Sequence, residues 1–428
     1  MSDRPTIVAL SSGAPPAAIG VVRVSGPQAG DAIMALAGRI PEARRPSLAR
    51  LKDADGAPLD DALVLWFPGP RTATGEDLAE FHCHGGRAVV DAVQRALVGL
   101  PGLRLAEAGE FTRRSFANGR LDLAQAEGLA DLLSAETEMQ RAAALASAQG
   151  GLSSQVEQWR DAVLRLSAQV EAALDFSDED DVDELPEGFT WNIEELSRAL
   201  ALWLERPRAE KLGEGFRVAL AGPPNAGKST LFNALIESEA AITSPIAGTT
   251  RDVIERSVAM SGVPFSFVDT AGLRSESEDA IERVGIERAR AELERADVIL
   301  WLGRVEDGQT GSWVIAAQSD REEFFVTKPS ARFTLSAVTG SGVSELKHAL
   351  IEEARGVLPK PGEVALNARQ HGRLEEAYAA LVSAGAKRDL LLIGEELRTV
   401  RLAFDRLIGK STTEDMLDAL FGRFCIGK

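Results

Sequence analysis

The chain has 428 residues, of which 45% are hydrophobic and 26% charged, and its formal net charge is −18. This length exceeds what one hydrophobic core can hold and predicts roughly two to four domains. The acidic balance argues against nucleic-acid binding by bulk charge, and no apolar run is long enough to span a membrane. Cys83 and Cys425 are too few for a disulfide framework, and the N-terminus lacks a signal-peptide pattern, so a cytoplasmic location is expected.

Residues 1–117 predict an N-terminal α+β domain. Its patterns indicate strands at Thr6–Leu10, Ile19–Val24, Ala62–Phe67 and Leu78–Cys83, and a helix at Arg87–Val98. His82, Cys83 and His84 are residue types that bind metals, but alternation along a strand points Cys83 away from both histidines, which favours a structural role. A basic cluster is either a nucleic-acid patch or, as we prefer, a solvated face: Arg39, Arg44, Arg45, Arg50 and Lys52.

Residues 118–211 and 357–428 predict the two parts of one helical domain. In the first part, apolar residues from Leu152 to Leu174 recur every three or four positions, as in a long amphipathic helix. In the second part, the stripe from Leu397 to Ile408 has the same spacing. The acidic run Asp175–Glu187 predicts a solvated loop, with a partner surface as the alternative.

Between these parts, residues 212–356 predict a nucleotide-binding domain. The segment Gly222–Thr230 fits the P-loop pattern G-x-x-x-x-G-K-[ST], follows a buried strand at Phe216–Leu220 and precedes a helix at Leu231–Ile236. Its framing glycines allow a tight turn whose N–H groups face a phosphate. Lys228 can reach the β- and γ-phosphates, and the Ser229 hydroxyl can bind Mg²⁺. This context disfavours the alternative, a glycine-rich loop that holds no nucleotide.

The remainder of this domain predicts a mostly parallel sheet covered by helices on both faces. Val253–Met260 and Val263–Val268 flank Ser261-Gly262 as a hairpin. Later strands alternate with helices, at Val298–Gly303, Trp313–Ala317 and Phe333–Ala337. The predicted fold class is α/β and α: a Ras-like P-loop domain inserted into a helical domain, behind an N-terminal α+β domain.

Three positions after the P-loop favour GTP over ATP. Thr250 lies in a polar loop that can close over Mg²⁺ and the γ-phosphate, and Asp269 ends a strand beside the P-loop. Gly272 can offer its backbone N–H to the γ-phosphate. In this order the segments resemble the G1, G2 and G3 motifs of the translation-factor-like P-loop GTPases.

Along nearly its whole length, the chain resembles the MnmE (TrmE) family of tRNA-modifying GTPases. The segments that carry the resemblance lie in all the predicted domains: Gly20–Gly26, Thr74–Asp77, His84–Gly86, Gly109–Thr112, Leu121–Glu127, Gly222–Thr230, Ile246–Asp252, Asp269–Arg274, Glu282–Arg288 and Phe424–Lys428.

The resemblance implies a GTP-hydrolysing enzyme that modifies the 5-position of the wobble uridine of certain tRNAs. It implies a flavin-dependent partner protein, joined in a heterotetramer, and a one-carbon donor such as 5-formyl-tetrahydrofolate or a related folate. The N-terminal domain would bind the folate and form a homodimer. The implied cofactors are GTP, Mg²⁺, K⁺ and the folate, and no membrane is involved.

The resemblance also implies roles for individual residues. Folate contacts fall on Arg23, Glu80, Arg120 and Lys428, although the family usually has a lysine where Arg120 stands. Potassium would stand in for an arginine finger, held at Asn225, Ser244, Ile246 and Thr249. The catalytic set would be Lys228, Thr250, Gly272 and Glu282. Glu282 would act on the attacking water because Leu273 replaces the usual glutamine; a solvated carboxylate is the alternative.

The full set of predicted nucleotide contacts follows the same motifs: Asn225, Ala226, Gly227, Lys228, Ser229, Thr230, Ser244, Pro245, Ile246, Ala247, Gly248, Thr249, Thr250, Asp269, Thr270, Ala271, Gly272, Asp320, Ser336 and Ala337. The usual base-reading motif N-K-x-D is Ala317-Gln318-Ser319-Asp320 here. Asp320 should still accept two hydrogen bonds from guanine, while loss of the asparagine and lysine should weaken nucleotide binding.

Two other functions share some of these motifs. A ribosome-assembly GTPase would have the P-loop set, but it would not explain Arg23–Gly26 or Phe424–Lys428 and would normally carry a basic RNA-binding domain. A scaffold that no longer hydrolyses GTP is suggested only by Ala317-Gln318, and intact Lys228 and Asp269 argue against it.

Overall fold

The computed structural model of the chain describes residues 4–175, 185–237, 240–241, 254–269, 290–321, 330–411 and 414–427. These residues fall into two compact units. Unit 1 comprises Met1–Ala130, Ser153–Glu157 and Leu402–Lys428, and unit 2 comprises Asp131–Leu152 and Gln158–Arg401. No helix in the described ranges is long and apolar enough to cross a membrane. The predicted domain boundaries stay predictions.

Unit 1 is built on a six-stranded sheet in the order β3-β4-β5-β2-β1-β6. Its strands are β1 (Thr6–Leu10), β2 (Ile19–Ser25), β3 (Ser47–Lys52), β4 (Pro58–Phe67), β5 (Leu78–His84) and β6 (Leu103–Leu105). The pair β1 and β6 is parallel, and the other neighbours are antiparallel. The four predicted strands are confirmed, whereas β3 and β6 were not predicted.

One face of this sheet is covered by α1 (Ala29–Ala37) and α2 (Arg87–Val98), and the core lies between them and the strands. Alternation along the strands places Val22, Phe81 and Cys83 in this core. Burial raises the pKa of the Cys83 thiol to about 11. Cys83 is therefore structural, as predicted, and His82 lies on the other side of the strand.

In the rest of unit 1, residues 414–427 pack against the N-terminal part of the chain. The helices α3 (Glu110–Ala117), α4 (Leu123–Ser134) and α14 (Glu414–Phe421) share an apolar cluster that includes Phe421 and Phe424. Beyond α14, the Ser11 hydroxyl donates to the carbonyl oxygen of Gly427 at 2.8 Å. Gly427 has a φ of 98°, and a Cβ there would clash with the carbonyl oxygen of Leu10, so only glycine allows this approach.

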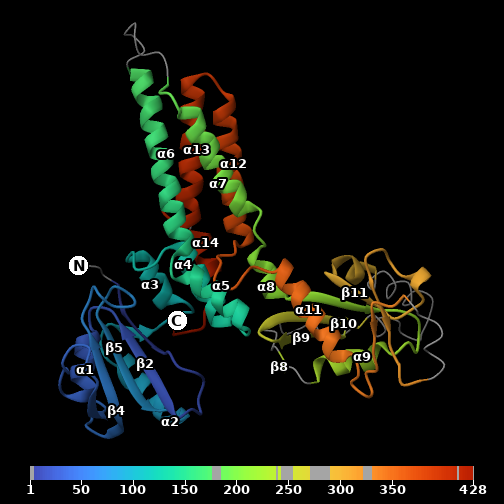
Figure 1. The fold of residues 1–428 in the computed structure, drawn as a ribbon. Helices are drawn as coiled ribbons and strands as arrows, with labels where there is room; N and C mark the ends of the chain where they lie inside the picture. The colour runs from blue at the N-terminus through green and yellow to red at the C-terminus, as the bar shows by residue number, and fades with distance from the viewer. Residues whose placement is uncertain are drawn as a thin grey trace, which may run out of the picture. The chain divides into compact units, whose positions relative to one another are not determined.

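Unit 2 contains a bundle of helices that are far apart in sequence (Figure 1). Its members are α6 (Gly151–Asp175), α7 (Phe189–Leu204), α12 (Ala368–Ala386) and α13 (Leu390–Ile408), of which α6 and α13 also pass through unit 1. Trp159 and Trp203 join α6 to α7 edge to face, with ring centroids 5.4 Å apart. Ser383 of α12 donates to Glu396 of α13 at 2.9 Å. The predicted helical parts before and after the P-loop domain thus pack together.

Unit 2 also contains the P-loop domain, a seven-stranded sheet in the order β13-β12-β11-β7-β10-β9-β8. Its strands are β7 (Phe216–Ala221), β8 (Ala240–Ala241), β9 (Ile254–Met260), β10 (Val263–Asp269), β11 (Val298–Trp301), β12 (Trp313–Ala316) and β13 (Phe333–Thr334). All pairs are parallel except those that β9 makes with β8 and β10. Flanking helices include α8 (Ala209–Glu214), α9 (Lys228–Ile236) and α11 (Val343–Val357). The predicted mostly parallel sheet is confirmed.

One further helix, α5 (Glu138–Ala148), contacts the hairpin of β9 and β10. Thr137 and Gln140 close its N-terminus as a capping box, and Met139 N–H donates to the carbonyl of Gly262 in the hairpin turn at 3.1 Å. The Met139 side chain is buried in the same apolar cluster as Phe265. A helix outside the predicted P-loop domain is therefore part of its core.

Candidate functional site

The P-loop joins the carboxyl end of β7 to the start of α9, as predicted. Gly227, the residue before α9, has a φ of 90°, in the left-handed region that glycine adopts without strain. The loop therefore ends in a tight turn at the N-terminus of a nine-residue helix. This end of a helix carries unpaired N–H groups and a partial positive charge, which favours phosphate.

Lys228 is folded across this loop. Its Nζ donates to the carbonyl oxygens of Gly222 at 2.9 Å and Pro223 at 2.7 Å, and the residue is only 7% exposed. These carbonyls hold the ammonium group beside the mouth of the loop, where it can contact a phosphate.

Ser229 of α9 and Asp269 at the end of β10 are neighbours. Strand β10 pairs with β7 so that Asp269 lies opposite Leu220, at the carboxyl end of the sheet. The Ser229 hydroxyl donates to Asp269 Oδ2 at 2.8 Å, and Asp269 is 2% exposed. Hydroxyl and carboxylate oxygens are the ligand types that Mg²⁺ takes in phosphate sites, so these residues fit the predicted magnesium.

The base-side residues Asp320 and Ser336 are also brought together. A hydrogen bond from the Ser336 side chain is the main cause that lowers the pKa of Asp320, so this carboxylate is ionised at neutral pH. The backbone supports the arrangement, because Ser319 N–H donates to the carbonyl of Leu335 at 3.1 Å. An exposed carboxylate beside a buried hydroxyl is available to accept hydrogen bonds from a base.

Gln318 makes a contact that the sequence analysis missed. Its Nε2 donates to the backbone carbonyl of Asn225 in the P-loop at 3.2 Å. The lysine expected at this position was thought to be lost without replacement. The Gln318 amide instead makes a hydrogen bond to the P-loop, the loop that the lysine was expected to brace.

A second polar cluster lies on the face of the unit 1 sheet opposite α1 and α2. Arg23 Nε and Nη2 donate to Glu80 Oε1 at 3.0 and 2.9 Å, and His82 Nε2 lies 3.1 Å from Glu80 Oε2. Burial raises the pKa of Glu80, but the hydrogen bonds and charges of His82 and Arg23 outweigh it, so the pKa is lowered. The Arg23 guanidinium also lies over the Phe111 ring, 5.9 Å from its centroid.

Arg23 and Glu80, two of the predicted folate contacts, are thus neighbours. Arg120 is exposed and packs over Gly75, where a Cβ would lie 3.2 Å from Arg120 Cγ. Gly427, which precedes Lys428, contacts Leu10, and Leu10 pairs with Val22 beside Arg23. A charged pair over an aromatic ring, next to the chain end, fits a ligand that carries carboxylates and a flat polar ring.

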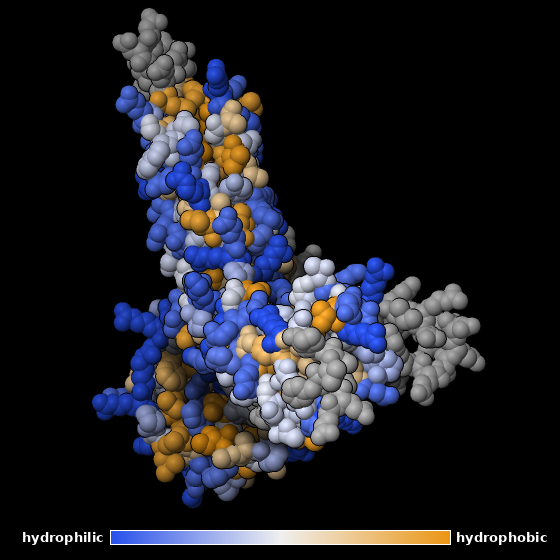
Figure 2. Space-filling model, turned by 45° about the vertical axis from the view of Figure 1, so that its right-hand side comes forward, coloured by the Kyte–Doolittle hydropathy of each residue, from blue (hydrophilic) through white to orange (hydrophobic). Residues whose placement is uncertain are grey.

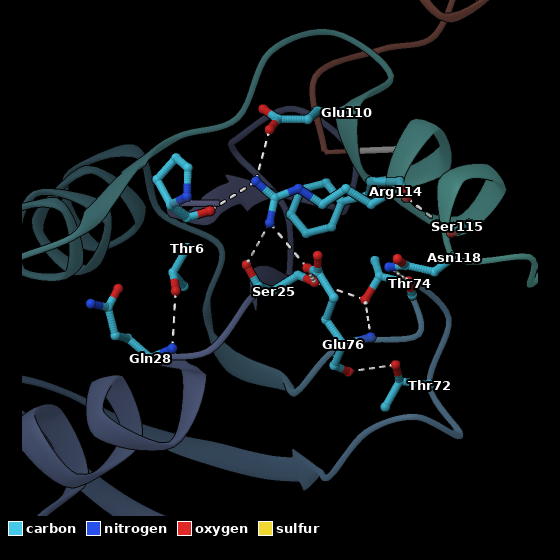
Figure 3. Close-up of polar contacts among 12 residues, drawn as sticks. Thr6, Ser25, Gln28, Thr72, Thr74, Glu76, Glu110, Arg114, Ser115 and Asn118 are labelled. Atoms are coloured by element: carbon cyan, nitrogen blue, oxygen red, sulfur yellow. Dashed lines mark hydrogen bonds and ion pairs between the residues drawn. The ribbon is translucent and has the colours of Figure 1, made fainter. Parts of the chain in front are cut away.

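The motifs at Thr74–Asp77 and Gly109–Thr112 gather around a buried arginine that the sequence analysis did not single out (Figure 3). Arg114 is 4% exposed and donates to Glu76 Oε2 at 3.0 Å, to Glu110 Oε1 at 2.9 Å and to the carbonyl of Pro5 at 2.8 Å. The spacing of Glu110 and Arg114, four residues apart on one helix, was the available signal. These motifs therefore hold α3 to the sheet.

The structure describes the predicted basic cluster but not all of the predicted site residues. In the basic cluster near residues 39–52, Arg45 pairs with Glu42 and Arg50 with Asp61, which favours the solvated face. No group of three or more metal-binding side chains is found within the described ranges. The remaining predicted site residues lie outside the described residues, so their roles stay predictions: Ser244, Pro245, Ile246, Ala247, Gly248, Thr249, Thr250, Thr270, Ala271, Gly272, Glu282 and Lys428.

The P-loop, its folded-over lysine and the serine–aspartate pair define a nucleotide-binding protein of the P-loop class. A family model described as "GTP-binding protein TrmE N-terminus" matches residues 6–120, and one described as "MnmE helical domain" matches residues 123–425. Proteins called "tRNA modification GTPase MnmE" are similar over the whole chain. The one from Erythrobacter litoralis is 62% identical, covering 99% of this chain and 100% of the relative, and the one from Novosphingobium aromaticivorans is 60% identical, covering 99% of each. The chain belongs to this family, that of the tRNA modification GTPase MnmE.

Among solved structures, Aquifex aeolicus Era bound to GDP.AlF4- is 25% identical, and the match covers 40% of this chain and 68% of that chain. The TM-score of this superposition is 0.25.

Proposed function

We propose that this protein hydrolyses GTP and, with a flavin-dependent partner, modifies the 5-position of the wobble uridine of certain tRNAs using a tetrahydrofolate one-carbon donor. The observation that carries the proposal is the arrangement of Lys228, Ser229 and Asp269 in a chain similar throughout to tRNA modification GTPases. The reaction is assigned to the cytoplasm.

In this proposal the P-loop residues bind and align the triphosphate. The N–H groups at the start of α9 and the ammonium of Lys228 contact the β- and γ-phosphates, where charge develops during transfer. Ser229 would hold Mg²⁺ with Asp269 behind it, and a bound magnesium ion would neutralise phosphate charge. Thr250 and Gly272 would contact the γ-phosphate, and Glu282 would act on the attacking water.

Potassium is assigned to a site that includes Asn225, Ser244, Ile246 and Thr249, of which Asn225 lies within the described residues. An amide oxygen suits this cation, and a positive charge near the transferred phosphate stabilises the transition state. Replacing sodium by potassium at equal ionic strength is expected to raise kcat for GTP hydrolysis about tenfold or more, compared with the 10³–10⁵ of an arginine finger. Equal turnover of the full-length protein in the two salts would contradict the potassium site.

The folate is assigned to the face of unit 1 that carries Arg23 and Glu80, with Arg120 and Lys428 as further contacts. Arg23 is only partly exposed, so its charge is available yet partly shielded from water. Residues of this cluster would bind and orient the folate, which supplies the one-carbon unit when bound. A guanidinium suits a carboxylate of the ligand, and Glu80 suits N–H donors of its ring.

Replacing Arg23 by alanine is expected to abolish wobble-uridine modification while GTP hydrolysis changes by less than about twofold, because Arg23 and the P-loop belong to different units. Mass analysis of the wobble uridines and a GTPase assay on the same preparation measure both effects. Arg95→Ala is the control, since Arg95 is an exposed arginine of unit 1 on α2, which covers the other face of the same sheet. Loss of both activities in Arg23→Ala would indicate misfolding, and unchanged modification would contradict the folate site.

The proposal includes a homodimer that forms through unit 1. This homodimer would join the flavin-dependent partner protein in a heterotetramer. Hydrophobic residues appear among the hydrophilic ones on the surface of the molecule (Figure 2). On the sheet face that carries Arg23, Leu48 of β3 and Leu63 of β4 are register partners and are 66% and 44% exposed. Their neighbours Ala62 and Val64 point to the core below α1, so these leucines face outward. We assign this surface to the second copy.

A further inference from the structure

We propose that Gln318 is a positioning residue that fixes the orientation of the P-loop peptide between Asn225 and Ala226. This inference rests on the proposed GTP-binding function and goes beyond it, because the position belongs to a motif whose usual asparagine and lysine are absent. Gln318 touches the loop that would hold the phosphates, and its own loop carries Asp320, which would read the base.

The contact is made by two residues with unusual backbone conformations. Gln318 has a φ of 66° and Asn225 a φ of 60°, both in the left-handed region that residues other than glycine rarely adopt. In these conformations Gln318 Nε2 lies 3.2 Å from the carbonyl oxygen of Asn225. This hydrogen bond links the two residues and stabilises their left-handed conformations.

The side chain of Gln318 also covers the next turn of the P-loop. A Cβ built on Gly227 would lie 3.1 Å from Gln318 Nε2 and 3.5 Å from its Cγ. The glutamine therefore fills the space above Gly227, and a residue with a side chain there would displace it.

The orientation of the Asn225 carbonyl determines where the next N–H points. A trans peptide directs its N–H opposite to its carbonyl. With the Asn225 carbonyl turned outward to Gln318, the N–H of Ala226 faces the inside of the loop, 3.4 Å from the carbonyl oxygen of Pro223. Lys228 Nζ donates to the same Pro223 oxygen at 2.7 Å. Gln318 thus holds a phosphate-binding N–H on the side where the lysine ammonium lies.

The other end of the Gln318 loop is fixed independently. Ala317 is 2% exposed, Ser319 N–H donates to the Leu335 carbonyl, and Ser336 is hydrogen-bonded to Asp320. These contacts hold Asp320 without Gln318. Removing the glutamine amide should therefore disturb phosphate binding and leave base selection intact.

Titrating labelled GDP and ADP against the full-length protein and its variants tests this role. Gln318→Ala removes the amide, and Gln318→Asn keeps an amide and suits a positive φ but is one methylene too short. Both are expected to bind GDP about threefold to tenfold more weakly, the range for one neutral hydrogen bond. KM for GTP should rise by a similar factor with kcat unchanged. Gln318→Lys, which again offers a donor on a long side chain, should recover most of the loss.

Asp320→Asn provides the comparison for base reading, since it should reduce the preference for GDP over ADP, which Gln318→Ala should keep. GDP affinity and KM unchanged in Gln318→Ala would overturn the inference, as would no recovery in Gln318→Lys. Loss of the GDP preference in Gln318→Ala would overturn it too, by making Gln318 a base-reading residue. Failure of the wild-type protein to bind GDP would instead contradict the proposed function itself.

Discussion

Replacing Arg114 by methionine is expected to lower the free energy of unfolding of unit 1 by about 3–5 kcal/mol, the range for breaking a buried ion pair. The guanidinium is buried and serves Glu76, Glu110 and the Pro5 carbonyl together. Methionine has similar bulk but cannot donate, so two partly buried carboxylates lose a partner. Chemical denaturation of the full chain, followed by a probe in unit 1, measures the change.

Arg50→Met is the matched control because Arg50 makes two hydrogen bonds to Asp61 on the same sheet in an exposed position. Exposed pairs contribute little, so this variant should unfold nearly as the wild type does. Equal effects of the two substitutions would contradict a special role for Arg114.

The effect of Arg114→Met should also depend on pH. Burial raises the pKa of Glu110, but hydrogen bonds from Arg104, the Glu107 backbone and Arg114 outweigh it, and the pKa falls below 4.5. A carboxyl whose pKa is lowered by folding stabilises the fold above its unfolded value and loses that contribution as the pH falls through the folded value. The difference between wild type and Arg114→Met should therefore be full above pH 4.5 and shrink in stronger acid.

Replacing Lys228 by alanine is expected to lower kcat/KM for GTP hydrolysis by about 10²–10³-fold, the scale for losing one preorganised group that stabilises developing charge. The ammonium is already held at the mouth of the loop by Gly222 and Pro223, so little reorganisation precedes its contact with phosphate. Steady-state kinetics measures the effect, and thermal unfolding checks that the fold is kept.

Lys360→Ala is the control, since Lys360 is an exposed lysine outside the P-loop. It should hydrolyse GTP as the wild type does. A Lys228→Ala enzyme within about twofold of wild type would remove Lys228 from the catalytic set.

The parts of the fold that were predicted are those with local signals. The P-loop needs only nine consecutive residues between a strand and a helix, and the hairpin of β9 and β10 is marked by Ser261-Gly262 between two apolar runs. Strand β3 was missed because Arg50 and Lys52 were interpreted as part of a basic cluster, although Ala49–Lys52 alternates apolar and basic residues, which is itself a strand signal. Strand β6 has only three residues, too few for a pattern.

The contacts that sequence reasoning missed join residues far apart in the chain. Gln318 and Asn225 are separated by 93 positions, and Arg114 reaches Pro5 over 109. No local pattern fixes such a meeting, because it depends on how strands and loops stack in three dimensions. The absent N-K-x-D lysine was interpreted as a loss, since the sequence could not reveal that a glutamine amide reaches the same loop.

The link between Gly427 and Leu10 affects the order in which a nascent chain can complete its fold. Unit 1 needs residues before 131 and after 401, while residues 131–152 and 158–401 belong to unit 2. On the ribosome, strands β1 and β2 therefore leave the exit tunnel long before α14 and the segment that docks beside Leu10. The apolar partners of Phe421 and Phe424 on α3 and α4 stay uncovered throughout synthesis of the P-loop domain. Translation of α14 and of the segment up to Gly427 is then the step that closes unit 1.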